Sequence, residues 1–109
     1  FAGAFPTWLA PVQTILLSIT DRSNGYIEKL AKQFADADIR VETDLRNEKI
    51  GYKFREAQLQ KIPYMLVVWD KEVEQGLVSV RSRSKGDIGT MTPEEFMEMI
   101  LREIRDKAL

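Results

Sequence analysis

Two apolar runs of strand length constrain this chain more than any other feature. Residues 12–19 read VQTILLSI and residues 64–69 read YMLVVW, and both are almost continuously apolar. A run of this kind is typical of a central strand that is covered by other elements on both faces. The sequence therefore predicts a sheet that is buried between two layers, with these two strands at its centre.

The stretches between and after these runs predict the remaining elements. A helical stripe is formed by Ile27, Leu30, Ala31 and Phe34, and Ser23 or Asn24 is able to cap its first turn. Residues 39–45 alternate as a strand does. A second helix is predicted to begin near Asn47 and to end before Pro63, with Leu59 on its apolar side. Residues 70–76 are predicted to be the charged turn of a hairpin between strand 64–69 and strand 77–81. The motif Thr92-Pro93-Glu94-Glu95 predicts the start of the last helix.

This order predicts a three-layer α/β fold. Helical crossovers make the first three strands parallel, and the hairpin adds an antiparallel edge. With 109 residues the chain suits one domain. We expect residues 1–11 to be a linker from a preceding domain that is absent here, and residues 12–109 to form the domain itself.

The composition excludes several kinds of chemistry. The chain has no cysteine and no histidine, which rules out zinc fingers, disulfides, cysteine nucleophiles and Ser-His-Asp triads. It has neither of the common glycine-rich nucleotide motifs. No apolar run approaches the roughly 20 residues that a membrane span needs. The formal net charge is −1, so any nucleic-acid role must depend on a few local contacts.

A carboxylate site for magnesium is one functional hypothesis. Asp21, Asp44 and Asp70 follow the three predicted parallel strands, at the edge where such sheets bind ligands. This hypothesis predicts a small nucleotide- or phosphate-binding domain. The alternative is that these aspartates cap turns and helices, for which aspartate is a preferred residue.

Two clusters of polar residues offer a different chemistry. Arg46, Asn47 and Lys49 gather at a predicted helix start, which favours anions, although charged residues on helices usually just face water. Glu72 and Arg81 lie in the predicted hairpin. A carboxylate and a guanidinium there are able to read the edges of unpaired bases, or to pair with one another across the strands.

The order of these residues resembles the C-terminal anticodon-binding domain of bacterial-type threonyl-tRNA synthetases. Residues 44–53 read DLRNEKIGYK and residues 55–68 read REAQLQKIPYMLVV, with APVQ at 10–13, DKEV at 70–73 and VSVR at 78–81. The resemblance spans nearly the whole chain. It implies a mixed five-stranded sheet with three helices, including a short fifth strand near residues 88–91.

The resemblance also implies a function and a set of contacts. The parent enzyme is a cytoplasmic homodimer that joins threonine to its tRNA, with ATP and zinc bound in its catalytic domain and no cofactor in this fragment. The expected partners are the anticodon loop of threonine tRNA and the catalytic domain of the same chain, with no DNA and no membrane. By position, Glu72 and Arg81 are expected to bind the guanine at the second anticodon position, and Arg81, Asn47 and Lys49 the uracil at the third. Arg46, Lys53 and Arg55 are expected to support the RNA backbone.

One residue departs from the family's usual sequence. Trp69 stands where the family usually has glycine, between Val68 and Asp70. Its large ring either alters the turn that presents Glu72 or stacks on a base of the RNA loop. A third hypothesis, in which the domain serves only for dimerisation, predicts that Arg81→Ala leaves aminoacylation unchanged.

Overall fold

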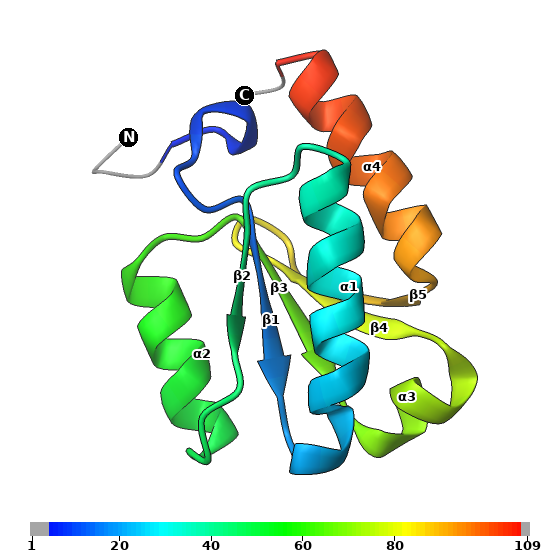
Figure 1. Ribbon diagram of the computed structural model, residues 1–109. Helices are drawn as coiled ribbons and strands as arrows, with labels where there is room; N and C mark the ends of the chain where they lie inside the picture. Colours follow the sequence, from blue (N-terminus) through cyan, green and yellow to red (C-terminus); the bar gives the residue numbers. More distant parts are fainter. Residues whose placement is uncertain (1–4, 108–109) are drawn as a thin grey trace.

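The computed structural model describes residues 5–107 as one mixed sheet with helices on both faces (Figure 1). Its strands are β1 (Thr14–Ser18), β2 (Val41–Asp44), β3 (Tyr64–Val68), β4 (Val78–Ser82) and β5 (Gly86–Met91). Its helices are α1 (Asn24–Asp36), α2 (Ile50–Leu59), α3 (Asp70–Gln75) and α4 (Pro93–Arg105), with 3-10 turns η1 (Thr7–Leu9) and η2 (Asp21–Ser23).

The sheet has the predicted topology. The strand order is β2-β1-β3-β4-β5; β1 is parallel to β2 and β3, whereas β4 is antiparallel to β3 and β5 is antiparallel to β4. The fifth strand, which the resemblance implied near residues 88–91, is present. The central strands β1 and β3 are buried along their whole length, as their apolar runs predicted.

The helices form two layers around this sheet. Helices α1 and α4 pack on one face, and α2 packs on the other (Figure 1). The three long helices are those that the sequence predicted. Within residues 5–107, none of the helices has the length and apolar character that crossing a membrane requires.

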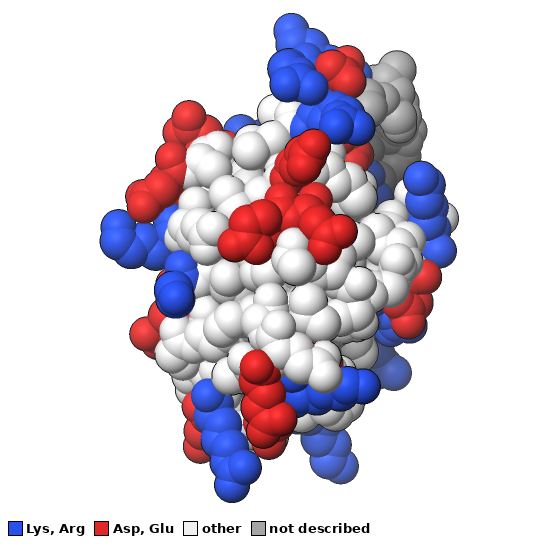
Figure 2. All heavy atoms as spheres, turned by 90° about the vertical axis from the view of Figure 1, so that its right-hand side faces the viewer, with Lys and Arg blue, Asp and Glu red and all other residues white. Residues whose placement is uncertain are grey.

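Charges of both signs are mixed on the surface. On the side of the molecule that carries α4, acidic and basic side chains surround a broad uncharged area (Figure 2). No continuous basic surface is visible on this side, in keeping with the net charge of −1. Recognition of an anionic partner through this side by charge alone is therefore disfavoured.

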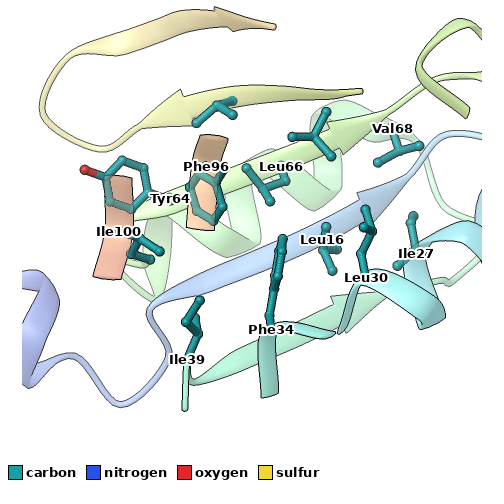
Figure 3. Close-up of a cluster of buried hydrophobic side chains, with 12 residues drawn as sticks. Leu16, Ile27, Leu30, Phe34, Ile39, Tyr64, Leu66, Val68, Phe96 and Ile100 are labelled. Atoms are coloured by element: carbon teal, nitrogen blue, oxygen red, sulfur yellow. The ribbon is translucent and has the colours of Figure 1, made fainter. Parts of the chain in front are cut away.

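The larger of two hydrophobic clusters lies between the sheet and helices α1 and α4 (Figure 3). Phe34 of α1 and Phe96 of α4 are completely buried, and their ring centroids lie 5.6 Å apart. Tyr64 of β3 contacts Phe96 edge to face at 5.6 Å. The smaller cluster fills the space under α2 and includes Leu17, Ala57 and Val67 among its buried members.

The structure corrects two predicted boundaries. The charged stretch 70–76 is not a simple hairpin turn, because residues Asp70–Gln75 form the short helix α3, which ends at Gly76 in the left-handed conformation. Helix α2 begins at Ile50 rather than near Asn47. The intervening residues 45–49 form an irregular loop, because the backbone at Lys49 is still extended, with φ −65° and ψ 140°.

Two predicted side-chain roles are also wrong. Leu59, which was assigned to the apolar side of α2, is 75% exposed. Ser23 does not cap α1 through its side chain, since its hydroxyl group donates to the carbonyl of Thr20. At α4, by contrast, Thr92 and Glu95 exchange the predicted pair of capping hydrogen bonds, at 3.1 and 3.0 Å.

The described part of the predicted linker, residues 5–11, lies against the domain. The Thr7 hydroxyl donates to Glu103 of α4 at 2.6 Å, and the Arg40 guanidinium donates to the carbonyls of Trp8 and Ala10. Trp8 is half-buried, and the Lys107 ammonium group lies 5.4 Å from its ring centroid. Residues 1–4 of the predicted linker lie outside the described residues.

Phe34→Ala tests this packing. The substitution removes a buried ring that joins α1 to α4, and we expect the free energy of unfolding to fall by about 3–5 kcal/mol. Urea unfolding followed by circular dichroism measures this change. Lys29→Ala, on the exposed side of the same helix, is the matched control and is expected to change stability by less than about 0.5 kcal/mol.

Candidate functional site

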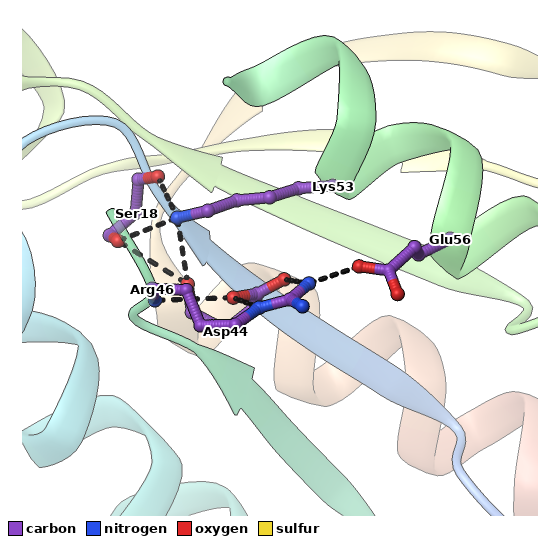
Figure 4. A network of polar contacts seen from close by, with 5 residues as sticks. All are labelled: Ser18, Asp44, Arg46, Lys53 and Glu56. Carbon is purple, nitrogen blue, oxygen red and sulfur yellow. Dashed lines mark hydrogen bonds and ion pairs between the residues drawn. The ribbon is translucent and has the colours of Figure 1, made fainter. Parts of the chain in front are cut away.

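A buried lysine joins the ends of two strands to α2. The Lys53 side chain, from the second turn of α2, is only 1% exposed. Its ammonium group donates to the Ser18 carbonyl at 2.8 Å, to the Ser18 hydroxyl at 3.1 Å and to the Asp44 carbonyl at 3.2 Å (Figure 4). Ser18 and Asp44 are the last residues of β1 and β2. This contact therefore closes the carboxyl edge of the sheet.

The position of Lys53 contradicts its predicted role in supporting an RNA backbone. Burial of the ammonium group lowers the pKa of Lys53, although the nearby Asp44 carboxylate raises it in part. The sequence contained a signal for this burial. Ile50, Lys53 and Ala57 recur at i, i+3 and i+7, which places Lys53 on the inner side of the helix.

An arginine fastens the following loop to the same edge. Arg46 donates to both carboxylate oxygens of Asp44, at 2.9 and 2.8 Å, and also pairs with Glu56 of α2 (Figure 4). Its guanidinium lies 5.6 Å from the ring centroid of Tyr52. Hydrogen bonding from Arg46 is the main cause of a lowered pKa at Asp44. Because two carboxylates already hold Arg46, we do not include it among the proposed RNA contacts.

Asn47 and Lys49 project from the loop that this network holds. Both residues are exposed, and neither side chain has a hydrogen bond or ion pair within residues 5–107. The Lys49 carbonyl accepts hydrogen bonds from the backbone N–H groups of Tyr52 and Lys53, at the start of α2. The loop thus offers an amide and a flexible ammonium group beside the start of a helix, where a carbonyl or an anion is bound most easily.

Glu72 lies on α3, at the end of β3. It is only 6% exposed, and its Oε1 atom accepts the backbone N–H of Trp69 at 3.1 Å. Glu72 therefore holds the start of α3. Trp69 has φ −93° and ψ 169°, an extended conformation that any residue adopts without strain. The backbone at Trp69 is thus unstrained.

Arg81 lies on β4 and faces α2. It is half-buried, and its guanidinium lies 5.0 Å from the ring centroid of Phe54. Sequence reasoning did not identify Phe54 as its neighbour. Arg81 also lines a hollow of about 210 Å³ together with Gln58 and Met65. The ring orients the guanidinium by a cation–π contact and leaves its N–H groups available as donors.

Polar interactions do not join the four predicted anticodon residues in the described part of the chain. Within residues 5–107 no hydrogen bond or ion pair joins any two of Asn47, Lys49, Glu72 and Arg81, so the predicted cross-strand pair of Glu72 with Arg81 is absent. Arg55 is exposed and its role stays a prediction. Asn47, Lys49 and Arg81 reach solvent, whereas Glu72 is largely buried. The four residues come from three separate elements, which suits an extended partner better than a small molecule.

The three aspartates of the magnesium hypothesis have different surroundings. Asp44 is paired with Arg46, and Asp70 accepts from the Thr20 hydroxyl at 2.8 Å and lies 3.7 Å from Arg22. In the described part of the chain, no group of three or more acidic residues is arranged to hold a metal ion. The structure thus offers no specific support for this hypothesis.

Comparison with known proteins identifies relatives along the whole chain. Residues 11–103 match a family described as anticodon binding domain. The chain is 61% identical over 109 residues to a threonine–tRNA ligase of Caldanaerobacter subterraneus and 60% identical over 107 residues to one of Clostridium botulinum. These alignments cover 100% and 98% of this chain. The chain spans 17% of the length of each of these curated relatives.

Solved structures share the fold. The RNA-binding domain of threonyl-tRNA synthetase from Cryptosporidium parvum superimposes with a TM-score of 0.88 at 27% identity, covering 93% of this chain and 26% of the other. Histidyl-tRNA synthetase from a Nostoc species has a TM-score of 0.80 at 20% identity, covering 86% and 23%. The second likeness concerns the fold alone.

Lys53→Met tests the buried network. Methionine keeps much of the volume but leaves the Ser18 and Asp44 carbonyls without this donor, and we expect the free energy of unfolding to fall by about 1–3 kcal/mol. Lys49→Met removes an exposed lysine four residues away and is the control, with an expected change below about 0.5 kcal/mol. Equal losses in the two variants, measured by urea unfolding, would contradict a structural role for Lys53.

Asp44→Asn tests the pairing with Arg46 through its pH dependence. Because the folded-state pKa of Asp44 is lowered from 3.8, its carboxylate stabilises the fold above about pH 4, and this contribution is lost as the pH falls further. We expect the variant to be less stable than the original chain at pH 7. The gap should close on acidification below pH 4, as measured by thermal unfolding at several pH values. A gap that is constant with pH would exclude titration of Asp44 as its cause.

Proposed function

This chain belongs to the anticodon binding domain family, and from that membership we propose that it reads the anticodon loop of threonine tRNA as a domain of a threonine–tRNA ligase. The observation that carries the proposal is the identity of about 60% to such ligases along the whole chain. The exposed loop at Asn47 and Lys49 and the guanidinium of Arg81 support it, since unpaired bases are recognised by polar side chains that reach their edges.

The proposed contacts divide between two bases. Glu72 and Arg81 bind the guanine at the second anticodon position, where the carboxylate accepts from the N–H donors of the base. Arg81, Asn47 and Lys49 bind the uracil at the third position. Since Glu72 is largely buried and also holds the backbone of Trp69, its carboxylate is fixed before the RNA arrives. A fixed acceptor loses less conformational entropy on binding.

The whole enzyme's properties extend this proposal. In this proposal the whole ligase attaches threonine to its tRNA with ATP and works in the cytoplasm as a homodimer. It binds ATP and zinc in a catalytic domain outside this chain. This chain has no histidine or cysteine, the usual ligands of zinc. The domain itself contributes no catalytic residue in this proposal. Its role is to select the tRNA whose acceptor end the catalytic domain then charges.

Aminoacylation by the full-length ligase that carries this domain tests the proposal. We expect Arg81→Ala and Glu72→Gln each to lower kcat/KM for threonine tRNA by about 5- to 150-fold, by analogy with the loss of one base contact in DNA recognition. Glu72→Gln is preferred to alanine because glutamine still accepts the backbone N–H of Trp69. Threonine activation without tRNA should be unchanged, since no anticodon takes part in that step.

Lys85→Ala is the matched control for Arg81→Ala. It removes one positive charge from an exposed position in the turn between β4 and β5. We expect it to charge tRNA normally. If Arg81→Ala and Glu72→Gln also charge tRNA normally, the proposed contacts are wrong and the domain serves only as a scaffold.

A further inference from the structure

An exposed tryptophan stands next to the proposed contacts without a role in the fold. Trp69 is 47% exposed, and neither hydrophobic cluster of the described residues includes it. Its backbone, in contrast, is fixed, because Glu72 accepts its N–H and its carbonyl accepts the N–H of Val73 at 3.1 Å. An indole ring with few rotatable bonds on a fixed backbone presents a rigid apolar surface.

The strand register places Trp69 at the same edge of the sheet as the loop of Asn47 and Lys49. Leu17 of β1 lies opposite both Asp44 of β2 and Val67 of β3. Arg46 follows Asp44 by two residues and Trp69 follows Val67 by two residues. Both therefore lie just beyond the carboxyl edge of the sheet, one on each side of β1. At a strand spacing of about 4.8 Å, the ends of β2 and β3 are about 10 Å apart.

The alternation of the strand also decides which face the ring lies on. Met65 and Val67 belong to the cluster under α2, and Trp69 continues this series with an extended backbone. Arg81 pairs with Met65 across the sheet and lies on that same face beside Phe54. Trp69 and Arg81 therefore lie on the same face of the sheet, the face that carries α2. A partner that binds the Lys49 loop from this face is able to reach both.

We propose that Trp69 is a stacking platform for one unpaired base of the RNA loop. The inference rests on the proposed function, because Lys49 at the same edge of the sheet and Arg81 on the same face supply the charge that attracts an RNA backbone, and Trp69 supplies the apolar surface. Bases of single-stranded RNA stack on exposed aromatic side chains whatever their sequence. Trp69 thus adds affinity at a position next to the base that Glu72 and Arg81 select.

The fluorescence of Trp69 tests this stacking directly. Trp8→Phe leaves Trp69 as the single tryptophan, since the chain has two. This variant is titrated at low salt with an RNA hairpin that carries the anticodon loop of threonine tRNA. We expect saturable quenching, with a Kd that matches fluorescence anisotropy of the labelled hairpin. An RNA duplex of equal length, which has no unpaired base, should leave the emission unchanged.

Substitution of the ring provides the second measurement. We expect Trp69→Leu to weaken binding of the hairpin by about 5- to 150-fold, the loss found for one stacked base, while Trp69→Phe retains most of the affinity. Urea unfolding should show both variants to be as stable as the original chain, because the ring is outside the core and the backbone conformation suits any residue.

The outcomes separate this inference from the proposed function. If Trp69→Leu binds the hairpin normally and the emission does not change, while Arg81→Ala weakens binding, stacking is overturned and anticodon recognition stands. If hairpin and duplex bind equally, and neither Arg81→Ala nor Lys49→Ala matters, the proposed function fails and the stacking inference fails with it.

Discussion

The ammonium group of Lys53 holds together the edge of the sheet from which the candidate site projects. A charge this deeply buried is unfavourable unless nearby acceptors compensate it, and three oxygen atoms of Ser18 and Asp44 do so. These contacts set the distance between β1, β2 and the second turn of α2. The loop that carries Asn47 and Lys49 lies between two of these anchored points, so its path depends on them.

Several basic residues belong to the fold. Arg40, Arg46, Lys53 and Arg83 donate to backbone carbonyls or pair with carboxylates. Within residues 5–107, the Lys49 side chain has no such partner, and the Arg81 guanidinium has no hydrogen bond or ion pair and lies over the ring of Phe54. With a net charge of −1, general attraction of phosphates is weak. Specific contacts by a few positioned groups are the physical alternative, and they are what the proposed function requires.

Helix α3 couples recognition to local folding. Glu72 is proposed to accept from a guanine base, yet it also holds the backbone N–H of Trp69 at the start of this helix. The carboxylate is thus oriented by the same turn that presents the indole ring. Since α3 ends at Gly76 in the left-handed conformation, the chain reverses directly into β4, which carries Arg81. One short segment therefore positions both Glu72 and Trp69 and leads into the strand that carries Arg81.

The sequence alone determined the elements whose signals are local. Apolar runs predicted the buried strands β1 and β3, and the Thr92 capping motif predicted the start of α4. The sequence motifs in residues 44–68 identified the family. Helix α3 was missed because its six residues lack an apolar stripe. Only the tertiary structure decided that Lys53 is internal and that Arg81 lies over Phe54. Those contacts join residues distant in sequence, and composition and spacing do not specify which side chains meet across the sheet.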